Sequence, residues 1–243
     1  MSGLFSLDSW STVWTHRESF LLGLGNTLQT AVCALALAFI IGAALGLMST
    51  SGNKPLRIVA RIYVEFIQNT PLLLQLCFLY YALAFAGVSL GVIRTGIIAL
   101  GVYTGAYMGE VVRAAIESVP KGQFEAGYAQ GFNTVEVLLY IVLPQAYRNI
   151  VPTLLSQVIT TIKDSSYLAN VATIELMARI RQLLSAAGTY NGLGTVNVSD
   201  VMVLFGAACV IYFVINFTLS CVVRSMQNRR KKALVFAPAK NAA

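Results

Sequence analysis

The stretch "LQTAVCALALAFIIGAALGLM" (residues 28–48) contains no charged residue, and no charge occurs anywhere between residues 19 and 53. A helix needs about 20 apolar residues to cross the hydrocarbon core of a bilayer. This stretch therefore predicts a membrane-spanning helix.

The composition extends this prediction to the whole chain of 243 residues. Of these, 57% are hydrophobic and only 11% are charged, whereas soluble domains carry about 25% charged residues. We expect an all-α, polytopic membrane protein with five transmembrane helices, forming one membrane domain over residues 1–228 with a basic tail at 229–243. The further spans are predicted at 63–87, 92–112, from about 150 onward, and 201–223.

Two features refine the expected spans. Gly101, Gly105 and Gly109 repeat at a spacing of four, which places them on one helix face where a neighbouring helix can approach closely. The fourth span is interrupted by "KDSS" at 163–166. Residues 163–190 can form either one long helix or a helix, a break and a second short helix.

The distribution of basic residues predicts the orientation. Of the 17 Lys and Arg residues, 12 fall in the segments 49–61, 113–148 and the C-terminal tail. Because basic loops stay in the cytoplasm, the N-terminus is expected outside and the C-terminus inside. The "RRKK" tail (229–232) could suggest nucleic acid, but in a membrane protein it is better explained as a topology anchor facing anionic lipid, so no nucleic-acid partner is expected. Trp10 and Trp14 fit an outer interfacial belt or a short helix lying on the membrane.

Several function classes lack the residues they would need. Cys33, Cys77, Cys209 and Cys221 lie in apolar runs without ligand spacing and are expected to be small buried hydrophobic residues, not disulfides or metal ligands. His16 is the one histidine, so no zinc-protease motif exists, and neither a G-x-S-x-G nor a phosphate-binding glycine loop is present. We expect no catalytic residue, cofactor or metal on this chain.

Residues 119–148 form an unusually long and polar cytoplasmic loop that predicts two short helices. The first would be capped by Ser118, carry Pro120 in its first turn and run to about residue 130. Gly131 would end it, because glycine takes a left-handed turn at low cost.

The second short helix starts at Asn133, which forms a capping-box pattern with Glu136. "VEVLLYIVL" (135–143) continues it, and Pro144 is expected to disrupt or end it. On local physics alone, an amphipathic hairpin resting on the membrane surface explains this segment equally well.

The spacing E-A-x-x-x-x-G, nine residues, then I-x-L-P resembles the EAA loop of permease subunits of ATP-binding-cassette importers. The matching residues are Glu125, Ala126, Gly131, Ile141, Leu143 and Pro144. Gly127 stands where the family has a second alanine, and Gln68 stands where it commonly has arginine. The segments 63–76, 107–127 and 162–176 resemble the polar-amino-acid branch of the family.

The resemblance implies a division of labour between subunits. The EAA loop would be the coupling loop that docks on a dimer of cytoplasmic ATPase subunits, and ATP with Mg²⁺ would be bound and hydrolysed there and not on this chain. A second permease, identical or similar, and an extracytoplasmic substrate-binding protein would complete a multi-pass complex in the bacterial cytoplasmic (inner) membrane. The implied ATPase-coupling residues are Lys121, Gly122, Gln123, Glu125, Ala126, Gly131, Ile141, Leu143 and Pro144.

Polar residues inside the predicted spans are candidates for a substrate site, because ionisable groups at membrane depth are costly and mark function. Asn69 and Thr70 precede Pro71, which frees a backbone carbonyl at about Ile67 and bends the helix; polar groups facing cytoplasmic headgroups are the alternative. Glu65 lies just before them, near the start of the same span.

A second polar cluster lies roughly 20 Å along the fourth span. We expect Lys163, Asp164 and Ser165 to line a substrate path together with Asn69 and Thr70; a structural network between helices is the alternative.

Two further groups are less decided. Glu110 and Arg113, at i and i+3, are close enough to pair on one face and are expected to form a gate or structural ion pair. Glu175 is expected near the outer face, with its role open.

The leading hypothesis is the transmembrane subunit of an ATP-driven importer that moves a polar amino acid by alternating access; the resemblance favours the glutamine/glutamate group only weakly. The alternatives are a self-contained secondary transporter or channel, for which no internal repeat is visible, and an intramembrane hydrolase built on Ser165 and Lys163.

Overall fold

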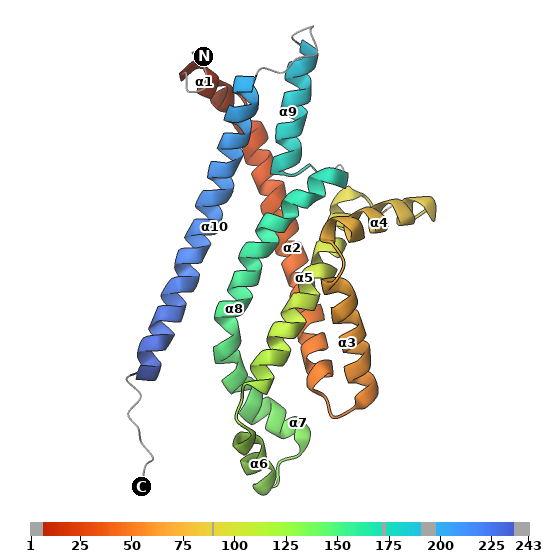
Figure 1. Ribbon diagram of the computed structural model, residues 1–243, viewed down its shortest axis with the longest axis vertical. Coiled ribbons are helices and arrows are strands. Elements are labelled where there is room, and N and C mark those ends of the chain that lie inside the picture. The colour runs from red at the N-terminus through yellow and green to blue at the C-terminus, as the bar shows by residue number, and fades with distance from the viewer. Residues whose placement is uncertain (1–6, 89, 172–173, 191–197, 236–243) are drawn as a thin grey trace.

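The computed structural model describes residues 7–88, 90–171, 174–190 and 198–235, and the regular structure in these ranges is helical, as predicted. Figure 1 shows an elongated bundle, with α1 and α9 at one end and α6 and α7 at the other. The elements in chain order are α1 (Leu7–Thr15), α2 (Arg17–Thr50), α3 (Lys54–Gln68), α4 (Leu72–Phe85), α5 (Val92–Glu117), α6 (Lys121–Ala129), α7 (Thr134–Glu136), the π-helical segment η1 (Val137–Val142), α8 (Leu143–Asp164), the 3-10-helical segment η2 (Ser165–Val171), α9 (Leu176–Tyr190) and α10 (Val198–Val235).

Three of the described helices are long and apolar enough to cross a membrane, namely α2, α5 and the part of α10 over residues 201–228. A fourth crossing results if the bent pair α3–α4 is one broken span. The helices thus support a multi-pass membrane protein. The count of five spans and the orientation of the termini remain predictions, because α8 does not meet the same criterion.

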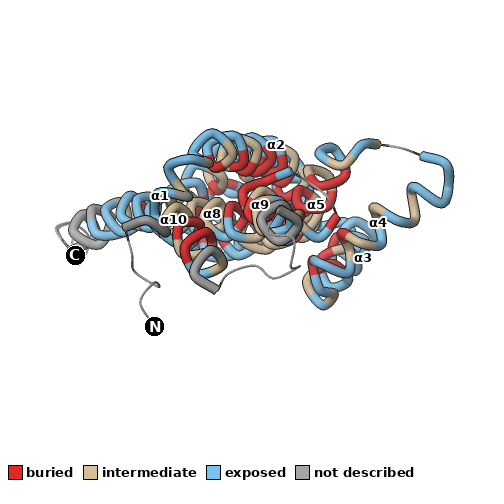
Figure 2. Tube along the Cα trace, turned by 90° about the horizontal axis from the view of Figure 1, so that it is seen from above, coloured by how far each residue is buried: buried red, intermediate tan, exposed pale blue. Residues whose placement is uncertain are grey.

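The centre of the bundle is the packing of α2 against α5. A Cβ built on Gly101, Gly105 or Gly109 would lie 2.8 Å from a side chain of α2, which is closer than real Cβ contacts come. The α2 side chains that fill these three positions are Leu37, Ile41 and Leu45. The predicted close approach at the glycine face is therefore confirmed, and Figure 2 shows buried residues concentrated where these two helices meet.

The second predicted span differs from expectation. Instead of one bent helix over 63–87, the chain forms α3 and α4, which meet at an angle of 100° across residues 69–71. Pro71 has no N–H to donate to the carbonyl of Ile67, and the side-chain Nε2 of Gln75 donates to that oxygen instead at 2.9 Å. The predicted bend is confirmed, but it is sharp enough that α4 projects sideways from the bundle (Figure 1).

Of the two alternatives for residues 163–190, the structure has the second, a helix followed by a break and another helix. α8 ends at Asp164, η2 follows, and α9 is a separate helix. α8 also begins at Leu143, earlier than the predicted start near residue 150. α9 ends at Tyr190 and α10 begins at Val198, and the residues between them, 191–197, lie outside the described residues.

Glu175, whose role was open, is fully buried at the start of α9. Its carboxylate accepts hydrogen bonds from the backbone N–H groups of Met177 (2.9 Å) and Ala178 (2.7 Å) and from the hydroxyl of Tyr212 on α10 (3.1 Å). Glu175 thus satisfies otherwise unpaired donors in the first turn of α9. On the same turn, the N–H of Leu176 donates to the hydroxyl oxygen of Thr27 on α2, so α2, α9 and α10 meet at one buried polar cluster.

The cysteine prediction is half correct. All four cysteines are free, but Cys33, Cys209 and Cys221 are exposed on the chain and Cys77 is half-buried. An apolar run in a membrane helix does not distinguish a side chain that faces the protein core from one that faces lipid or a partner, which explains the error.

Candidate functional site

The cytoplasmic loop forms a compact hairpin of α6 and α7, at the opposite end of the bundle from α1 (Figure 1). The predicted turn at Gly131 is confirmed, with φ at +88°, in the region that favours glycine. The predicted cap at Ser118 is wrong. Ser118 follows the last residue of α5 and its hydroxyl donates to the carbonyl of Ala115, while Pro120 occupies the position before α6.

The second half of the hairpin begins with the predicted capping box. The side-chain oxygen of Asn133 accepts from the N–H groups of Val135 and Glu136, both at 3.0 Å. In return, the carboxylate of Glu136 accepts from the N–H of Asn133 at 2.8 Å. This reciprocal pair fixes the start of α7.

Pro144 does not end the second helix as predicted. The chain passes from α7 through the π-helical segment η1 directly into α8, and Pro144 lies in the first turn of α8. A first-turn proline is tolerated because the N–H it lacks has no helical partner at that position. The hairpin is therefore continuous with α8 through helical backbone.

The hairpin is also packed against the ends of α5 and α8. Val137 and Val142 are buried in a cluster with Ile116 and Val119. A Cβ at Gly127 would lie 2.7 Å from Ile141 and 2.8 Å from Val137, so glycine allows α6 to lie close to η1. This close approach, at the position where the family has alanine, was not foreseen from the sequence.

The predicted coupling residues divide between the surface and the packed side of the hairpin. Lys121, Gly122, Gln123, Glu125, Ala126, Gly131 and Pro144 are exposed, whereas Ile141 and Leu143 are half-buried. The side-chain Nε2 of Gln145 donates to Gln123 (3.1 Å) and ties α6 to α8. Large side chains that the sequence analysis did not select are also exposed here: Tyr128, Val135, Leu139 and Tyr140.

A second candidate site is a chain of three adjacent cavities, which we call the polar trough. The outer cavity, of about 720 Å³, lies between α3 and α5; the middle one (460 Å³) and the inner one (260 Å³) lie between α5 and α8. Gln68 and Glu110 line both the outer and the middle cavity, and Tyr107 and Gln157 line both the middle and the inner cavity. The three spaces therefore follow one another from the end of the bundle that carries the hairpin toward Asp164.

The inner cavity is lined by polar groups of two helices. Asp164 and Thr160 come from α8, and Tyr103 and Tyr107 come from α5. The two tyrosine hydroxyls lie 3.2 Å apart. A half-buried carboxylate surrounded by hydroxyl groups can bind the ammonium group of a small solute.

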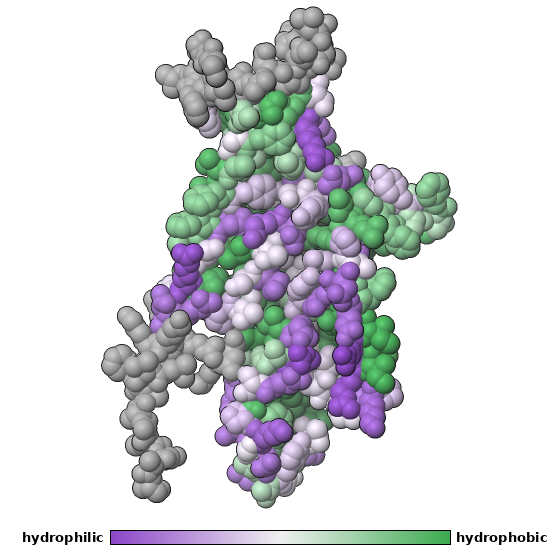
Figure 3. Space-filling view, in the orientation of Figure 1, coloured by the Kyte–Doolittle hydropathy of each residue, from purple (hydrophilic) through white to green (hydrophobic). Residues whose placement is uncertain are grey.

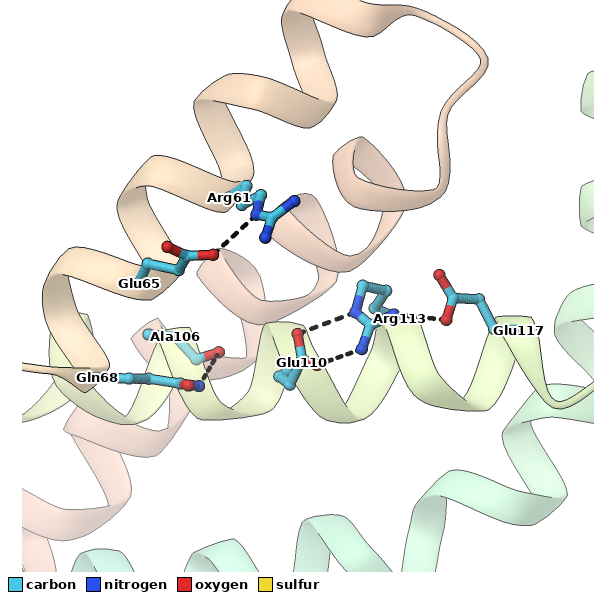
Figure 4. A network of polar contacts seen from close by, with 7 residues as sticks. All are labelled: Arg61, Glu65, Gln68, Ala106, Glu110, Arg113 and Glu117. Carbon is cyan, nitrogen blue, oxygen red and sulfur yellow. Dashed lines mark hydrogen bonds and ion pairs between the residues drawn. The ribbon is translucent and has the colours of Figure 1, made fainter.

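The outer cavity carries most of the charge (Figure 4). Arg113 pairs with Glu110 and with Glu117 along α5, which confirms the predicted Glu110–Arg113 pair and extends it by one residue. On α3, the side chain of Arg61 donates to Glu65 at 2.8 Å. Figure 3 shows the hydrophilic surface gathered between α3 and α5.

Gln68 lies at the junction of the outer and middle cavities, in the last turn of α3. Its Nε2 reaches the carbonyl of Ala106 at 3.5 Å, at the limit of a hydrogen bond (Figure 4). It extends from α3 toward α5, the helix that carries Glu110.

The trough includes only one of the five predicted substrate residues, Asp164. The side chains of Asn69 and Thr70 donate to backbone carbonyls of α3 at Glu65 (2.8 Å) and Phe66 (2.9 Å), as caps of that helix do. Lys163 and Ser165 do not line these three cavities either: Lys163 is exposed, and Ser165 is buried and donates to the carbonyl of Ile162.

A signal for the missed residues was present in the sequence. The polar α8 residues that line the trough are Thr153, Gln157, Thr160 and Asp164, at successive spacings of four, three and four. This spacing places them on one helix face, as does the i, i+4 pair Tyr103 and Tyr107 on α5. A search for polar stripes along the predicted spans would have found both.

Comparison with known proteins matches residues 38–232 to the family model described as the inner membrane component of binding-protein-dependent transport systems. The probable glutamine ABC transporter permease protein GlnM of Bacillus subtilis (strain 168) is 35% identical over 223 residues, which cover 92% of this chain and 98% of that protein. The L-cystine transport system permease protein TcyB of the same organism is 34% identical, over 88% of each chain.

A solved structure agrees with these relatives. The crystal structure of an amino acid ABC transporter with histidines aligns with a TM-score of 0.78 at 29% identity, over 90% of this chain and 98% of that one. Matches of this kind do not favour a self-contained secondary transporter or channel. The chain therefore belongs to the family of inner membrane components of binding-protein-dependent transport systems, and within it to the polar-amino-acid permeases of ATP-binding-cassette importers.

Proposed function

We propose that this chain is the membrane-spanning subunit of an ATP-driven importer that carries a polar amino acid through the polar trough. The observation that carries the proposal is that the trough and the docking hairpin share two helices, α5 and α8. Relatives named for glutamine and for cystine support a polar amino acid, and glutamine is the first substrate to test.

In this proposal ATP and Mg²⁺ are bound by a separate dimer of ATPase subunits, and this chain hydrolyses nothing. The ATPase docks on the exposed side of the hairpin, whose exposed residues include the charged Glu125 and Lys121 and the aromatic Tyr128 and Tyr140. Large exposed apolar side chains next to charged ones are typical of an interaction surface. The hairpin end then faces the cytoplasm, the N-terminus lies outside, and the chain has five spans in the bacterial cytoplasmic membrane.

The coupling step follows from the continuity of the hairpin with its neighbours. α7, η1 and α8 form one unbroken helical path, and α6 is held to it by Gln123–Gln145 and by the close packing at Gly127. A displacement of the hairpin by the ATPase therefore moves the α8 end of the trough as a rigid body. α5 is held against α2 at its three glycines, so the movement changes the spacing between α5 and α8 at the inner cavity.

The trough is open on one side of the chain, and polar groups within the bilayer core must be shielded from lipid. We propose that a second permease, identical or similar, closes it, and that an extracytoplasmic binding protein delivers the amino acid from the α1–α9 end. Within the trough, Asp164 holds the substrate ammonium group, and the hydroxyls of Tyr103 and Tyr107 and the amide of Gln157 offer further hydrogen bonds.

The test is reconstitution in vesicles with labelled amino acid outside. The complete complex with its binding protein should take up L-glutamine, or another member of a panel of polar amino acids, only when ATP is present on the ATPase side. The chain without the ATPase should take up none. ATP-independent uptake by the chain alone would instead support the secondary transporter or channel.

A further inference from the structure

The outer cavity contains two cations that have no carboxylate partner among the described residues. It is lined by four basic and three acidic side chains, and the ion pairs join Arg61 to Glu65 and Arg113 to Glu110 and Glu117. Lys54 and Arg57, on the first turn of α3, remain. Both are exposed at the mouth of the cavity, so their positive charge is available to an anion.

The backbone at this position adds to the positive potential. The first turn of α3 has no side-chain cap and no acidic residue. The N–H groups at the start of a helix point outward without intrahelical partners, and the helix dipole is positive at this end. An anion at the mouth would therefore meet two free cations and the N-terminus of a 15-residue helix.

The charges farther along the trough are of the opposite sign. In the middle and inner cavities the charged lining residues are Glu110 and Asp164. A carboxylate is thus favoured at the mouth and an ammonium group deeper inside. This polarity matches a zwitterionic α-amino acid, which carries a carboxylate and an ammonium group on one small molecule.

The apolar residues of α3 argue against a lipid headgroup as the ligand of the outer cavity. Leu56, Val59, Ile62 and Phe66 are exposed and do not line the outer cavity, whereas one exposed apolar residue of α3, Ile58, does. In Figure 3 the outer edge of α3 is hydrophobic while the side toward α5 is hydrophilic. Acyl chains on that edge would lie on the far side of the helix from the outer cavity.

We propose that the outer cavity is a product site that binds the amino acid from the cytoplasmic side, with its carboxylate at Lys54 and Arg57 and its ammonium group toward Glu110, which also lines the middle cavity. This inference rests on the proposed function and its orientation. Occupancy of the site blocks the junction at Gln68 that the next substrate must pass. Amino acid that accumulates inside therefore slows import through this chain.

The test uses the complete complex in vesicles, with binding protein and labelled L-glutamine outside and ATP and increasing unlabelled L-glutamine inside. Each variant is compared with its own import rate from an empty lumen. In the wild type, import should fall as internal glutamine rises. In Lys54→Gln/Arg57→Gln the internal concentration that halves import should rise about tenfold or more, the effect expected for losing one charge-assisted hydrogen bond.

Arg224→Gln is the matched control, because it removes an exposed positive charge from α10 outside the trough. It should keep the wild-type sensitivity to internal glutamine. The measurements are repeated in vesicles of phosphatidylcholine alone and with added phosphatidylglycerol, since a lipid phosphate would use the same cations.

The outcomes separate this inference from the proposed function. A wild-type complex that imports no member of the amino-acid panel overturns both. Normal import that ignores internal glutamine, or equal inhibition in the wild type and the double variant, overturns the product site alone. A double variant that changes only the dependence on phosphatidylglycerol assigns Lys54 and Arg57 to a lipid headgroup and also overturns it.

Discussion

Gly131 offers a sharp test of the docking hairpin, because the chain contains a matched glycine on the same hairpin. A Cβ at either Gly131 or Gly122 would have nothing within 4 Å. The two positions differ in their backbone: Gly131 has φ at +88°, whereas Gly122 lies in α6 and is not among the glycines with positive φ. Substituting each with alanine therefore isolates the cost of the left-handed turn from any cost of packing.

The expected magnitude follows from the backbone alone. A left-handed conformation costs a residue other than glycine about 1–2 kcal/mol. We expect Gly131→Ala to relieve this strain by changing the turn in the undocked hairpin, whereas docking on the ATPase requires the turn to be restored, so the cost lowers the affinity for the ATPase. At about 1 kcal/mol, the Kd of Gly131→Ala should rise about fivefold. Gly122→Ala adds the same methyl group to the docking surface without a left-handed turn, and alanine favours the helix by up to about 1 kcal/mol, so its Kd should rise less than that of Gly131→Ala.

The assay is the affinity of the purified ATPase subunit for the permease in lipid nanodiscs, followed by transport per ATP hydrolysed in vesicles. Gly131→Asn should recover much of the lost affinity, because asparagine tolerates the left-handed region, and Gly131→Val should lose more than Gly131→Ala. Equal affinities for Gly131→Ala and Gly122→Ala, with wild-type coupling in both, would refute the argument that this turn sets the docking geometry.

Three further predictions concern Asp164 in the trough, the buried Glu175 at the start of α9, and the topology. Asp164→Asn should lower amino-acid import about tenfold, as expected for the loss of one charge-assisted hydrogen bond, without changing ATPase binding; Asn69→Ala, whose side chain caps α3, is the control, and an equal loss of import in both would remove Asp164 from the path. Glu175→Ala should destabilise the chain by about 1–3 kcal/mol, because it leaves the buried donors around it unpaired, and Glu175→Gln should cost less; thermal unfolding of the purified complex measures both, and an unchanged Tm for Glu175→Ala would contradict the structural role. A single cysteine at position 122 should react with a membrane-impermeant reagent only in inverted vesicles, and labelling in intact cells would reverse the proposed orientation.

The sequence predicted those parts of the fold that depend on local chemistry. The capping box at Asn133, the turn at Gly131 and the glycine face of α5 each follow from the conformational preference or size of a residue type, and each was found as expected. The bend at Pro71 was predicted for the same reason. Its angle was not, because the proline removes a hydrogen bond but tertiary packing decides how far α4 then swings.

Two predictions failed because the residue concerned can play either of two local roles, and the position of the helix boundary decides which one it plays. Ser118 is a good N-cap by type, but its hydroxyl donates to Ala115 at the end of α5. A proline usually breaks the interior of a helix. Pro144 instead lies in a first turn, because α8 begins at Leu143 and the preceding segment is π-helical. A shift of the helix boundary by a few residues therefore decides whether a proline ends a helix or is accommodated in its first turn.

Asp164 shows why the candidate site in the trough was only partly predictable from the sequence. Lys163, Asp164 and Ser165 are consecutive, and consecutive residues near the end of a helix point in different directions. Only one of them can face a given neighbour. That neighbour is α5, so Asp164 lines the trough, Ser165 is buried in the chain and Lys163 is exposed. The residues that share the site with Asp164 are those at helical spacing, Thr160 and Gln157, and those on the facing helix, Tyr103 and Tyr107. The cluster in the sequence included one residue of the trough, but helical periodicity and the facing helix determine which other side chains line it.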